Sequence, residues 1–272
     1  TSSTAFSTGN YTPQTRVYAP TILKLPGTKN VLINFDNGAC DDGSNPTGNG
    51  KVPLIYAFTV SCNTVFGNLG MQLGDNAIRQ QAVKFGMNDA NLRIPLPVSA
   101  SNYPPIPGND PALTAYSAIG QYSDQVTPLQ EAMFSAAIAN NGTLMTPYMV
   151  QKVTAPDLTP LETAQPTPLG QTVSPSVAAN VSQMMVDVVK QPYGTAHNTA
   201  FLPNIAIAAK TGTAQNGANN TGLDDAVFTC FAPVSNPQIA VGVIVKGGGL
   251  GADASAPIAV KIIQAYLASQ AK

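Results

Sequence analysis

The stretch Ile205-Ala-Ile-Ala-Ala-Lys-Thr-Gly-Thr-Ala-Gln215 joins an apolar run to a lysine, two threonines and a glycine. An apolar run of this length predicts a buried strand. A lysine is rare in such a strand unless its charge has a task. The polar end, Lys210 to Thr213, therefore predicts a site for a carboxylate or an extended peptide that docks along the strand edge. Alone, Lys-Thr-Gly is too short to identify a protein.

The segments around this stretch predict the fold class. Two further apolar runs of strand length, residues 226–231 and 239–245, follow it and are separated by proline-rich turn residues, which predicts a hairpin. Upstream, Thr127-Pro128 and Ser174-Pro175 each combine an N-cap residue with proline at the first helical position. Helices early, strands late and a closing helix from Ala256 predict an α+β fold with an antiparallel sheet.

Two other segments predict irregular structure. Residues 1–50 carry Gly and Pro turn signals so densely that we expect turns and short extended pieces without helices. Residues 94–118 are rich in Pro and Ser, and we expect a long ordered loop there.

Composition excludes several classes of protein. Of 272 residues, 44% are apolar and only 10% are charged, with a net charge of −1. A nucleic-acid binder needs a basic surplus to neutralise phosphates, and this chain has none. No apolar stretch of ~18 residues predicts a membrane-spanning helix. The polar surface that remains is typical of a secreted or wall-facing protein.

The sequence predicts neither a metal site nor a cofactor. The three cysteines and the single histidine lack the paired spacing of zinc ligands. The pattern Gly249-x-Gly251-x-x-Ala254 matches a dinucleotide fingerprint, but only 18 residues follow Ala254, too few for the required β-α-β unit. We expect a plain strand-to-helix turn there. His197 has no G-x-S-x-G partner, so we expect a surface-loop histidine.

A second motif makes the Lys-Thr-Gly stretch more specific. Ser61-Cys-Asn63 precedes Lys210-Thr-Gly212, in the order of the set S-x-x-K, S-x-N, K-T-G. The sequence resembles, over nearly its whole length, the transpeptidase domain of penicillin-binding proteins, and most closely the class-B, cell-division branch from actinobacteria. Four more segments carry the resemblance: residues 125–132, residues 138–142 with Pro147, residues 194–196, and residues 228–233. Cys230 in the last segment and Val227 just ahead of it depart from the pattern.

The resemblance implies an antiparallel β-sheet flanked by helices on both faces. No S-x-x-K stands ahead of Ser61, where the family carries it. We therefore expect residues 1–272 to be one transpeptidase domain that lacks its N-terminal segment, with the nucleophilic serine upstream of residue 1. On its own, the chain should be inactive.

The implied activity is that of a peptidoglycan D,D-transpeptidase, which cross-links stem peptides through an acyl-enzyme and is acylated by β-lactams. The resemblance gives Ser61 the role of proton relay and Asn63 that of holding the substrate amide and the missing lysine. Lys210 would face the terminal carboxylate of the substrate. No cofactor is implied.

The rest of the K-T-G strand would bind the substrate. Thr211 and Thr213 would donate to the carboxylate beside Lys210, and the Thr213 N–H would form half of an oxyanion hole. Gly212 would let the substrate approach the backbone.

The resemblance also implies partners and a location. The partners would be peptidoglycan stem peptides and β-lactams, with divisome proteins as further candidates. The protein would work at the extracytoplasmic face of the cell membrane, attached only through an N-terminal anchor absent here. Two alternatives stay open: an inert paralogue or peptidoglycan-binding module, and a secreted serine hydrolase or β-lactamase. The second disagrees with the 94–118 loop.

The cysteines complete the expectations. Cys62 is the middle residue of S-x-N, and Cys40 stands 22 residues ahead of it in a polar loop. We expect a Cys40–Cys62 disulfide that pins this loop beside the site, with two free thiols as the alternative. Cys230 lies in an apolar run and is expected to be a buried thiol.

Overall fold

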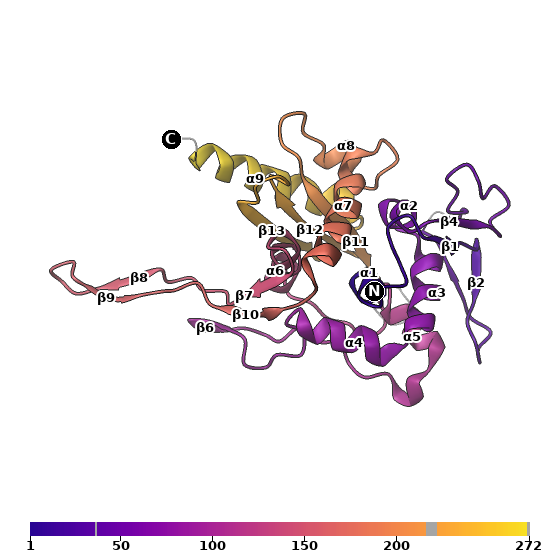
Figure 1. Ribbon diagram of the computed structural model, residues 1–272, viewed down its shortest axis with the longest axis horizontal. Coiled ribbons are helices and arrows are strands. Elements are labelled where there is room, and N and C mark those ends of the chain that lie inside the picture. The colour runs from indigo at the N-terminus through magenta and orange to yellow at the C-terminus, as the bar shows by residue number, and fades with distance from the viewer. Residues whose placement is uncertain (36, 216–221, 271–272) are drawn as a thin grey trace.

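A three-stranded antiparallel sheet lies at the centre of the computed structural model, which describes residues 1–35, 37–215 and 222–270 (Figure 1). Its order is β11 (Ala208–Ala214), β12 (Asp225–Ala232), β13 (Ile239–Val245). β11 pairs with β12 without a bulge, and β12 and β13 form the predicted hairpin. β11 begins three residues later than the apolar run 205–209 predicted and continues to Ala214, so Lys210 lies inside the strand, opposite Thr229.

Helices cover both faces of this sheet, as expected. The Thr229 hydroxyl donates to the Glu131 carbonyl of helix α6 (Pro128–Ala139), so this side chain of β12 faces α6. Because side chains alternate along a strand, Phe228 and Cys230 point to the opposite face, where both are fully buried. Helix α9 (Ala256–Gln270) contacts β12 and β13. The α+β class with an antiparallel sheet is confirmed.

The helix starts predicted from the sequence are confirmed. The Thr127 side chain accepts from the Gln130 N–H at the start of α6, and the Ser174 side chain accepts from the Val177 N–H at the start of α7 (Pro175–Lys190). Each hydroxyl satisfies an N–H that has no partner inside the helix. Helix α7 packs on β11 and holds one side of the main hydrophobic core.

Two predictions of irregular structure are each wrong in part, because each segment contains one short helix. Residues 2–7 form helix α1 (Ser2–Ser7), which lies in the middle of the molecule and buries Ala5 and Phe6 (Figure 1). Residues 111–117 form helix α5 (Pro111–Ser117), which begins where Asp110 accepts from the Ala112 and Leu113 N–H groups. Both helices are shorter than the windows in which periodicity can be recognised, so packing rather than pattern decides them.

The other elements surround this core. The remaining helices are α2 (Leu54–Thr59), α3 (Asn63–Leu73), α4 (Asp75–Lys84) and α8 (His197–Ala200), with a 3₁₀ turn at Pro107–Asn109 and a π-helical turn at Gly251–Ser255. The paired short strands are β1 (Arg16–Tyr18) with β4 (Lys51–Pro53), β2 (Ile22–Lys24) with β3 (Val31–Ile33), β5 (Arg93–Ile94) with β6 (Leu96–Pro97), β7 (Thr143–Met145) with β10 (Pro168–Gln171), and β8 (Lys152–Thr154) with β9 (Pro160–Thr163).

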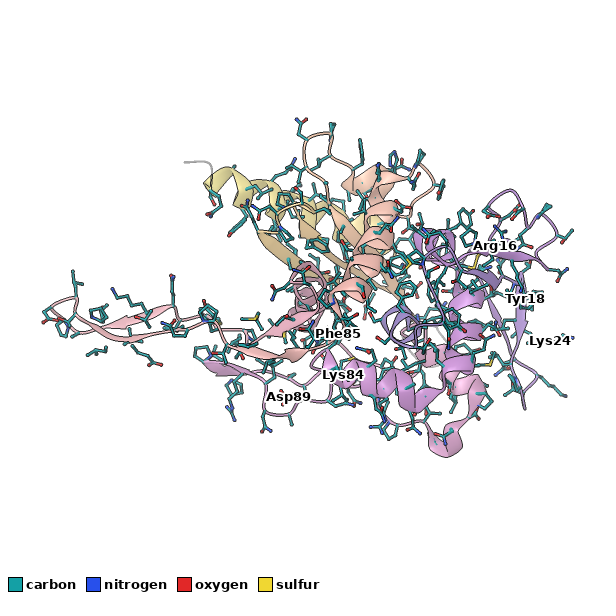
Figure 2. The ribbon with its side chains drawn as sticks, viewed as in Figure 1. Arg16, Tyr18, Lys24, Lys84, Phe85 and Asp89 are labelled. Carbon is teal, nitrogen blue, oxygen red and sulfur yellow. A yellow bond between two sulfur atoms is a disulfide. The ribbon has the colours of Figure 1, made fainter. Side chains whose placement is uncertain are left out.

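The β8–β9 ribbon projects far from the body, and β1 and β2, which carry Arg16, Tyr18 and Lys24, lie at the opposite edge (Figures 1 and 2). Within the described part of the chain, no helix has the length and apolar character needed to cross a membrane.

Candidate active site

Ser61 is presented by the end of helix α2. The Cys62 N–H donates to the Ala57 carbonyl at 2.8 Å, and the Ser61 N–H donates to the Phe58 carbonyl at 3.1 Å. This pair of bonds is a Schellman motif, which requires the residue at the Ser61 position to be left-handed. Glycine is usual there, yet Ser61 adopts φ +57°. A strained backbone conformation of this kind persists only where the surrounding structure holds it, and it is common at functional sites.

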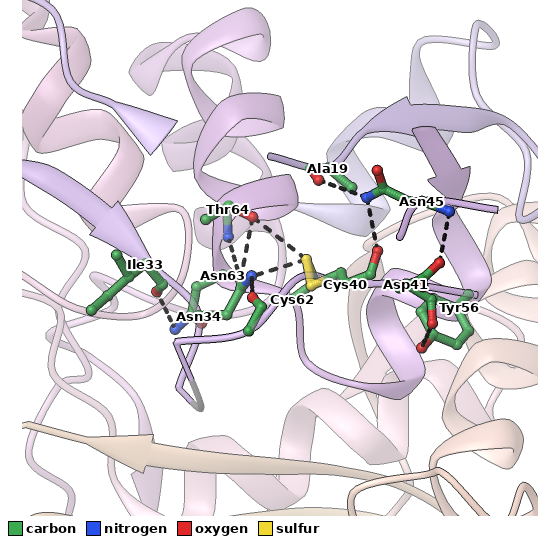
Figure 3. The surroundings of a disulfide bond; sticks show 11 residues. Ala19, Ile33, Asn34, Cys40, Asp41, Asn45, Tyr56, Cys62, Asn63 and Thr64 are labelled. Atoms are coloured by element: carbon green, nitrogen blue, oxygen red, sulfur yellow. Dashed lines mark hydrogen bonds between the residues drawn. A yellow bond between two sulfur atoms is a disulfide. The ribbon is translucent and has the colours of Figure 1, made fainter. Parts of the chain in front are cut away.

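A disulfide holds the residue that follows. Cys62 is bonded to Cys40 with their Cα atoms 6.1 Å apart, which confirms the expected pairing (Figure 3). Both cysteines are buried. Cys230 is a free, buried thiol on β12, also as expected. The bridge ties the turn that carries Ser61 to the loop after β3.

A buried asparagine in that loop holds the start of α3. Asn34 Oδ1 accepts from the Thr64 N–H at 3.1 Å and from Thr64 Oγ1 at 3.2 Å (Figure 3). It thereby satisfies an orphan donor of α3, since no side-chain cap comes from Cys62 at the N-cap position. Asn63 Nδ2 donates to the Ile33 carbonyl at 3.2 Å. The α2–α3 junction is therefore clamped from β3 and the loop after it at three successive residues, Cys62, Asn63 and Thr64.

Lys210 joins this junction to the sheet. Its Nζ donates to Ser61 Oγ at 2.8 Å and to the Thr211 carbonyl at 2.8 Å, and it lies 5.7 Å from the centroid of the Phe58 ring. Burial of the amine lowers the pKa of Lys210 to about 8, because a desolvated site disfavours the charged form. The structure thus brings together two predicted residues that are 149 positions apart.

The K-T-G strand has one free edge among the described residues, on the side away from β12. The Thr211 carbonyl accepts from Lys210, and the Thr213 carbonyl accepts from Gln121 Nε2 at 3.1 Å, so both point to that edge. In an antiparallel strand, the N–H and C=O of one residue face the same side. The Thr213 N–H is therefore directed to the free edge too, where the sequence predicted a docked peptide.

Several side chains at the site were missed by the sequence reasoning. Thr195 Oγ1 lies 2.7 Å from Thr211 Oγ1, and the Thr195 N–H donates to the Thr59 carbonyl at 3.2 Å, which links β11 to α2. The segment 194–196 was recognised only as part of the resemblance. Phe58, Asn34 and Gln121 belong to no short motif, so only the three-dimensional structure reveals them.

The glycine-rich segment and His197, to which the sequence assigned no function, have simple structures. The glycine-rich segment forms the expected strand-to-helix turn and runs through the π-helical turn into α9. His197 is not in a loop: it begins helix α8, and its Nδ1 lies 3.0 Å from the Val189 carbonyl. Within the described residues, no group of three or more His, Cys, Asp or Glu side chains could hold a metal ion.

One literal S-x-x-K was not recognised in the sequence. It is Ser269-Gln-Ala-Lys272, at the very end of the chain. Ser269 lies exposed in the last turn of α9 and donates to the Tyr266 carbonyl, and the last two residues lie outside the described ones. It follows the K-T-G strand, the reverse of the order in the set S-x-x-K, S-x-N, K-T-G, so it does not supply the missing motif.

The fold and this Ser–Lys site agree with one known family of proteins. Residues 2–264 match the family described as penicillin binding protein transpeptidase domain, and the chain belongs to that family. Peptidoglycan D,D-transpeptidase PbpA of Mycobacterium tuberculosis strain H37Rv is 36% identical over 273 residues, which cover 98% of this chain and 53% of the relative. The chain therefore spans about half the length of this curated relative.

Solved structures agree with this family. The crystal structure of PBPA from M. tuberculosis has a TM-score of 0.87 and 34% identity, covering 98% of this chain and 59% of that one. The penicillin G acyl-enzyme complex of penicillin-binding protein A from the same organism has a TM-score of 0.86 and 33% identity, covering 98% and 59%.

Proposed function

We propose that the whole protein is a peptidoglycan D,D-transpeptidase, which cross-links stem peptides through an acyl-enzyme and is acylated by β-lactams. The observation that carries this proposal is the 2.8 Å hydrogen bond from Lys210 Nζ to Ser61 Oγ beside the free edge of β11. The penicillin G acyl-enzyme of the M. tuberculosis relative supports it, because that complex is acylated on a similar fold.

Ser61 is the proton relay in this proposal. Its oxygen accepts a hydrogen bond from Lys210, so its own proton is available to donate to the amine that leaves the donor peptide. Ser61 then recovers a proton from Lys210 Nζ, which donates the hydrogen bond to it. The left-handed turn at Ser61 fixes the direction of this hydroxyl, and positional precision of that kind is what general acid–base catalysis requires.

Lys210 and the threonines of β11 bind the terminal carboxylate of the donor peptide. With a pKa of about 8, the amine is mostly protonated at neutral pH and offers a positive charge in a desolvated place. The Thr211 and Thr213 hydroxyls are the additional donors. Gly212, which has no side chain, lets the peptide approach the strand between them.

The Thr213 N–H supplies one half of the oxyanion hole, and the N–H of the nucleophilic serine supplies the other. One such donor is typically worth ~3 kcal/mol of transition-state stabilisation. Asn63, whose Nδ2 is held by the Ile33 carbonyl, hydrogen-bonds the substrate amide and the lysine of the upstream S-x-x-K.

The nucleophile lies upstream of residue 1 in this proposal, and residues 1–272 are a transpeptidase domain without its N-terminal segment. The missing motif supports this, since S-x-N and K-T-G are retained in order while no S-x-x-K precedes them. We further propose that the protein works at the extracytoplasmic face of the membrane, anchored by an N-terminal segment, and has divisome proteins among its partners.

Labelling by a fluorescent penicillin tests the function. The full-length protein should form a covalent band that survives denaturation, and unlabelled penicillin G should abolish it. The 272-residue chain on its own, checked for folding by circular dichroism, should stay dark. If the full-length protein is not labelled, the inert paralogue is the better description; if the short chain is labelled, the upstream nucleophile is wrong.

A further inference from the structure

The backbone around Gly212 is held from the free edge by two side chains, one on each side of the glycine. Lys210 Nζ donates to the Thr211 carbonyl at 2.8 Å, and Gln121 Nε2 donates to the Thr213 carbonyl at 3.1 Å. Lys210 belongs to the motif, whereas Gln121 comes from a loop 92 residues away in sequence.

These two hydrogen bonds flank Gly212, whose backbone must be held for the Thr213 N–H to keep its direction. The Thr213 N–H belongs to the peptide group that joins Gly212 to Thr213, and a glycine backbone rotates more freely than any other. One face of the strand is blocked, since a side-chain Cβ at Gly251 would lie 2.4 Å from the Gly212 carbonyl oxygen. β12 holds Gly212 from the paired edge, opposite Val227. Lys210 and Gln121 hold the open edge.

Gln121 is itself rigidly mounted. The Gly120 N–H donates to the Ser117 carbonyl at 2.9 Å, and the Gln121 N–H donates to the Tyr116 carbonyl at 3.0 Å. This is a second Schellman motif, with Gly120 in the left-handed conformation at φ +79°. The Ser117 hydroxyl also contacts both carboxylate oxygens of Asp124, at 2.8 and 2.9 Å, which closes the loop on its other side. The side chain of Gln121 therefore starts from a fixed backbone.

We propose that Gln121 is a positioning residue for the oxyanion donor: its amide fixes Thr213 so that the Thr213 N–H keeps its aim at the free edge. The inference rests on the proposed function. The Thr213 N–H, which Gln121 positions, acts mainly in the transition state, because charge develops on the substrate oxygen only there. Loss of the Gln121 donor therefore slows acylation more than it weakens binding.

The test uses the full-length protein and penicillin G, with acylation measured at several concentrations to separate the rate constant from the binding constant. Gln121→Glu and Gln121→Met both keep the length of the side chain and remove the donor. Gln125→Glu is the matched control, because Gln125 is an exposed glutamine in the same loop. We expect the acylation rate constant to fall by about tenfold or more in both Gln121 variants, with the binding constant within threefold of wild type.

Infrared spectroscopy of the acyl-enzyme adds a readout that a merely structural role would not move. Weaker hydrogen bonding from Thr213 should shift the ester carbonyl stretch of both Gln121 variants to higher frequency, while Gln125→Glu keeps the wild-type frequency. If Gln121→Glu fails to fold, which thermal unfolding shows, Gln121→Met decides. An unchanged rate constant and frequency in the folded Gln121→Met variant would overturn the inference. An unlabelled wild-type protein would instead overturn the proposed function.

Discussion

The two halves of the candidate site are held in place by different means. On the helical half, Ser61 depends on a left-handed turn, the Cys40–Cys62 bridge and the Asn34 clamp. On the strand half, β11 depends on seven residues in unbroken register with β12. The helical half thus depends on a disulfide and on side-chain contacts in addition to its turn, and the strand half depends mainly on its backbone ladder, to which Gln121 adds a side-chain contact at Thr213. Loss of the bridge should therefore act through conformation in the first half, and loss of Lys210 should act through a lost chemical group in the second.

Lys210 is the point at which the two halves meet, and its removal should have the largest effect. Lys210→Met deletes the hydrogen bond to Ser61 and the charge that faces the substrate carboxylate. We expect acylation of the full-length protein by penicillin G to slow by about 10²–10³-fold. Lys246→Met, at an exposed lysine that follows β13, is the matched control. Acylation within threefold of wild type in Lys210→Met would contradict the comparison.

The same substitution, which slows acylation, should remove a cost to folding. Because burial lowers the pKa of Lys210 to about 8, below the usual 10.5, the charged amine destabilises the folded state below pH 8. This cost disappears as the pH rises from 8 to 10.5. Wild-type stability should therefore rise relative to Lys210→Met across that window, measured by urea unfolding at fixed pH. A wild type that loses stability relative to the variant there would show that the amine is not desolvated.

Removal of the disulfide should test the helical half alone. Cys40→Ala with Cys62→Ala opens a bridge between positions 22 residues apart, which should lower the free energy of unfolding by about 3 kcal/mol. Acylation should slow as well, since the Ser61 turn loses its anchor. A reductant should destabilise the wild type but not the double variant. Thiol titration of the denatured chain should find one reactive cysteine without reductant, and three would disprove the bridge.

Two substitutions of Ser61 should separate its backbone strain from its chemistry. Ser61→Gly relieves the left-handed strain, whereas Ser61→Ala keeps it, so the glycine variant should be about 1 kcal/mol more stable in urea unfolding. Both lack the hydroxyl, so both should slow acylation strongly. An alanine variant as stable as the glycine variant would mean that the turn at Ser61 is not strained.

The sequence predicted the strand half of the site better than the helical half. The hairpin after β11 follows from local pattern, because strand alternation and turn residues are short-range signals. The apolar run 205–209 predicted a strand next to Lys210 but not its bounds, since β11 covers Ala208–Ala214. Ser61 and Asn63 were found only through a motif, and the left-handed turn at Ser61 has no sequence signal because serine replaces the usual glycine. Helices α1 and α5 were missed because each is less than two turns long and is held by its packing.

Two long-range contacts of the site were beyond any reading of the sequence. Asn34 clamps Thr64 from 30 residues away, and Gln121 reaches Thr213 from 92 residues away. Neither residue belongs to a periodic pattern or a short motif. Contacts of this kind depend on how distant segments are packed, which composition and spacing do not specify.

The central claim is that residues 1–272 supply the relay, the carboxylate site and one oxyanion donor to a nucleophile that lies upstream. Peptide mapping by mass spectrometry, after reaction of the full-length protein with penicillin G, tests it most directly. We predict one covalent adduct, on a serine ahead of residue 1 in an S-x-x-K sequence, and an unmodified Ser61. An adduct on Ser61, or on any other residue from 1 to 272, would contradict the claim.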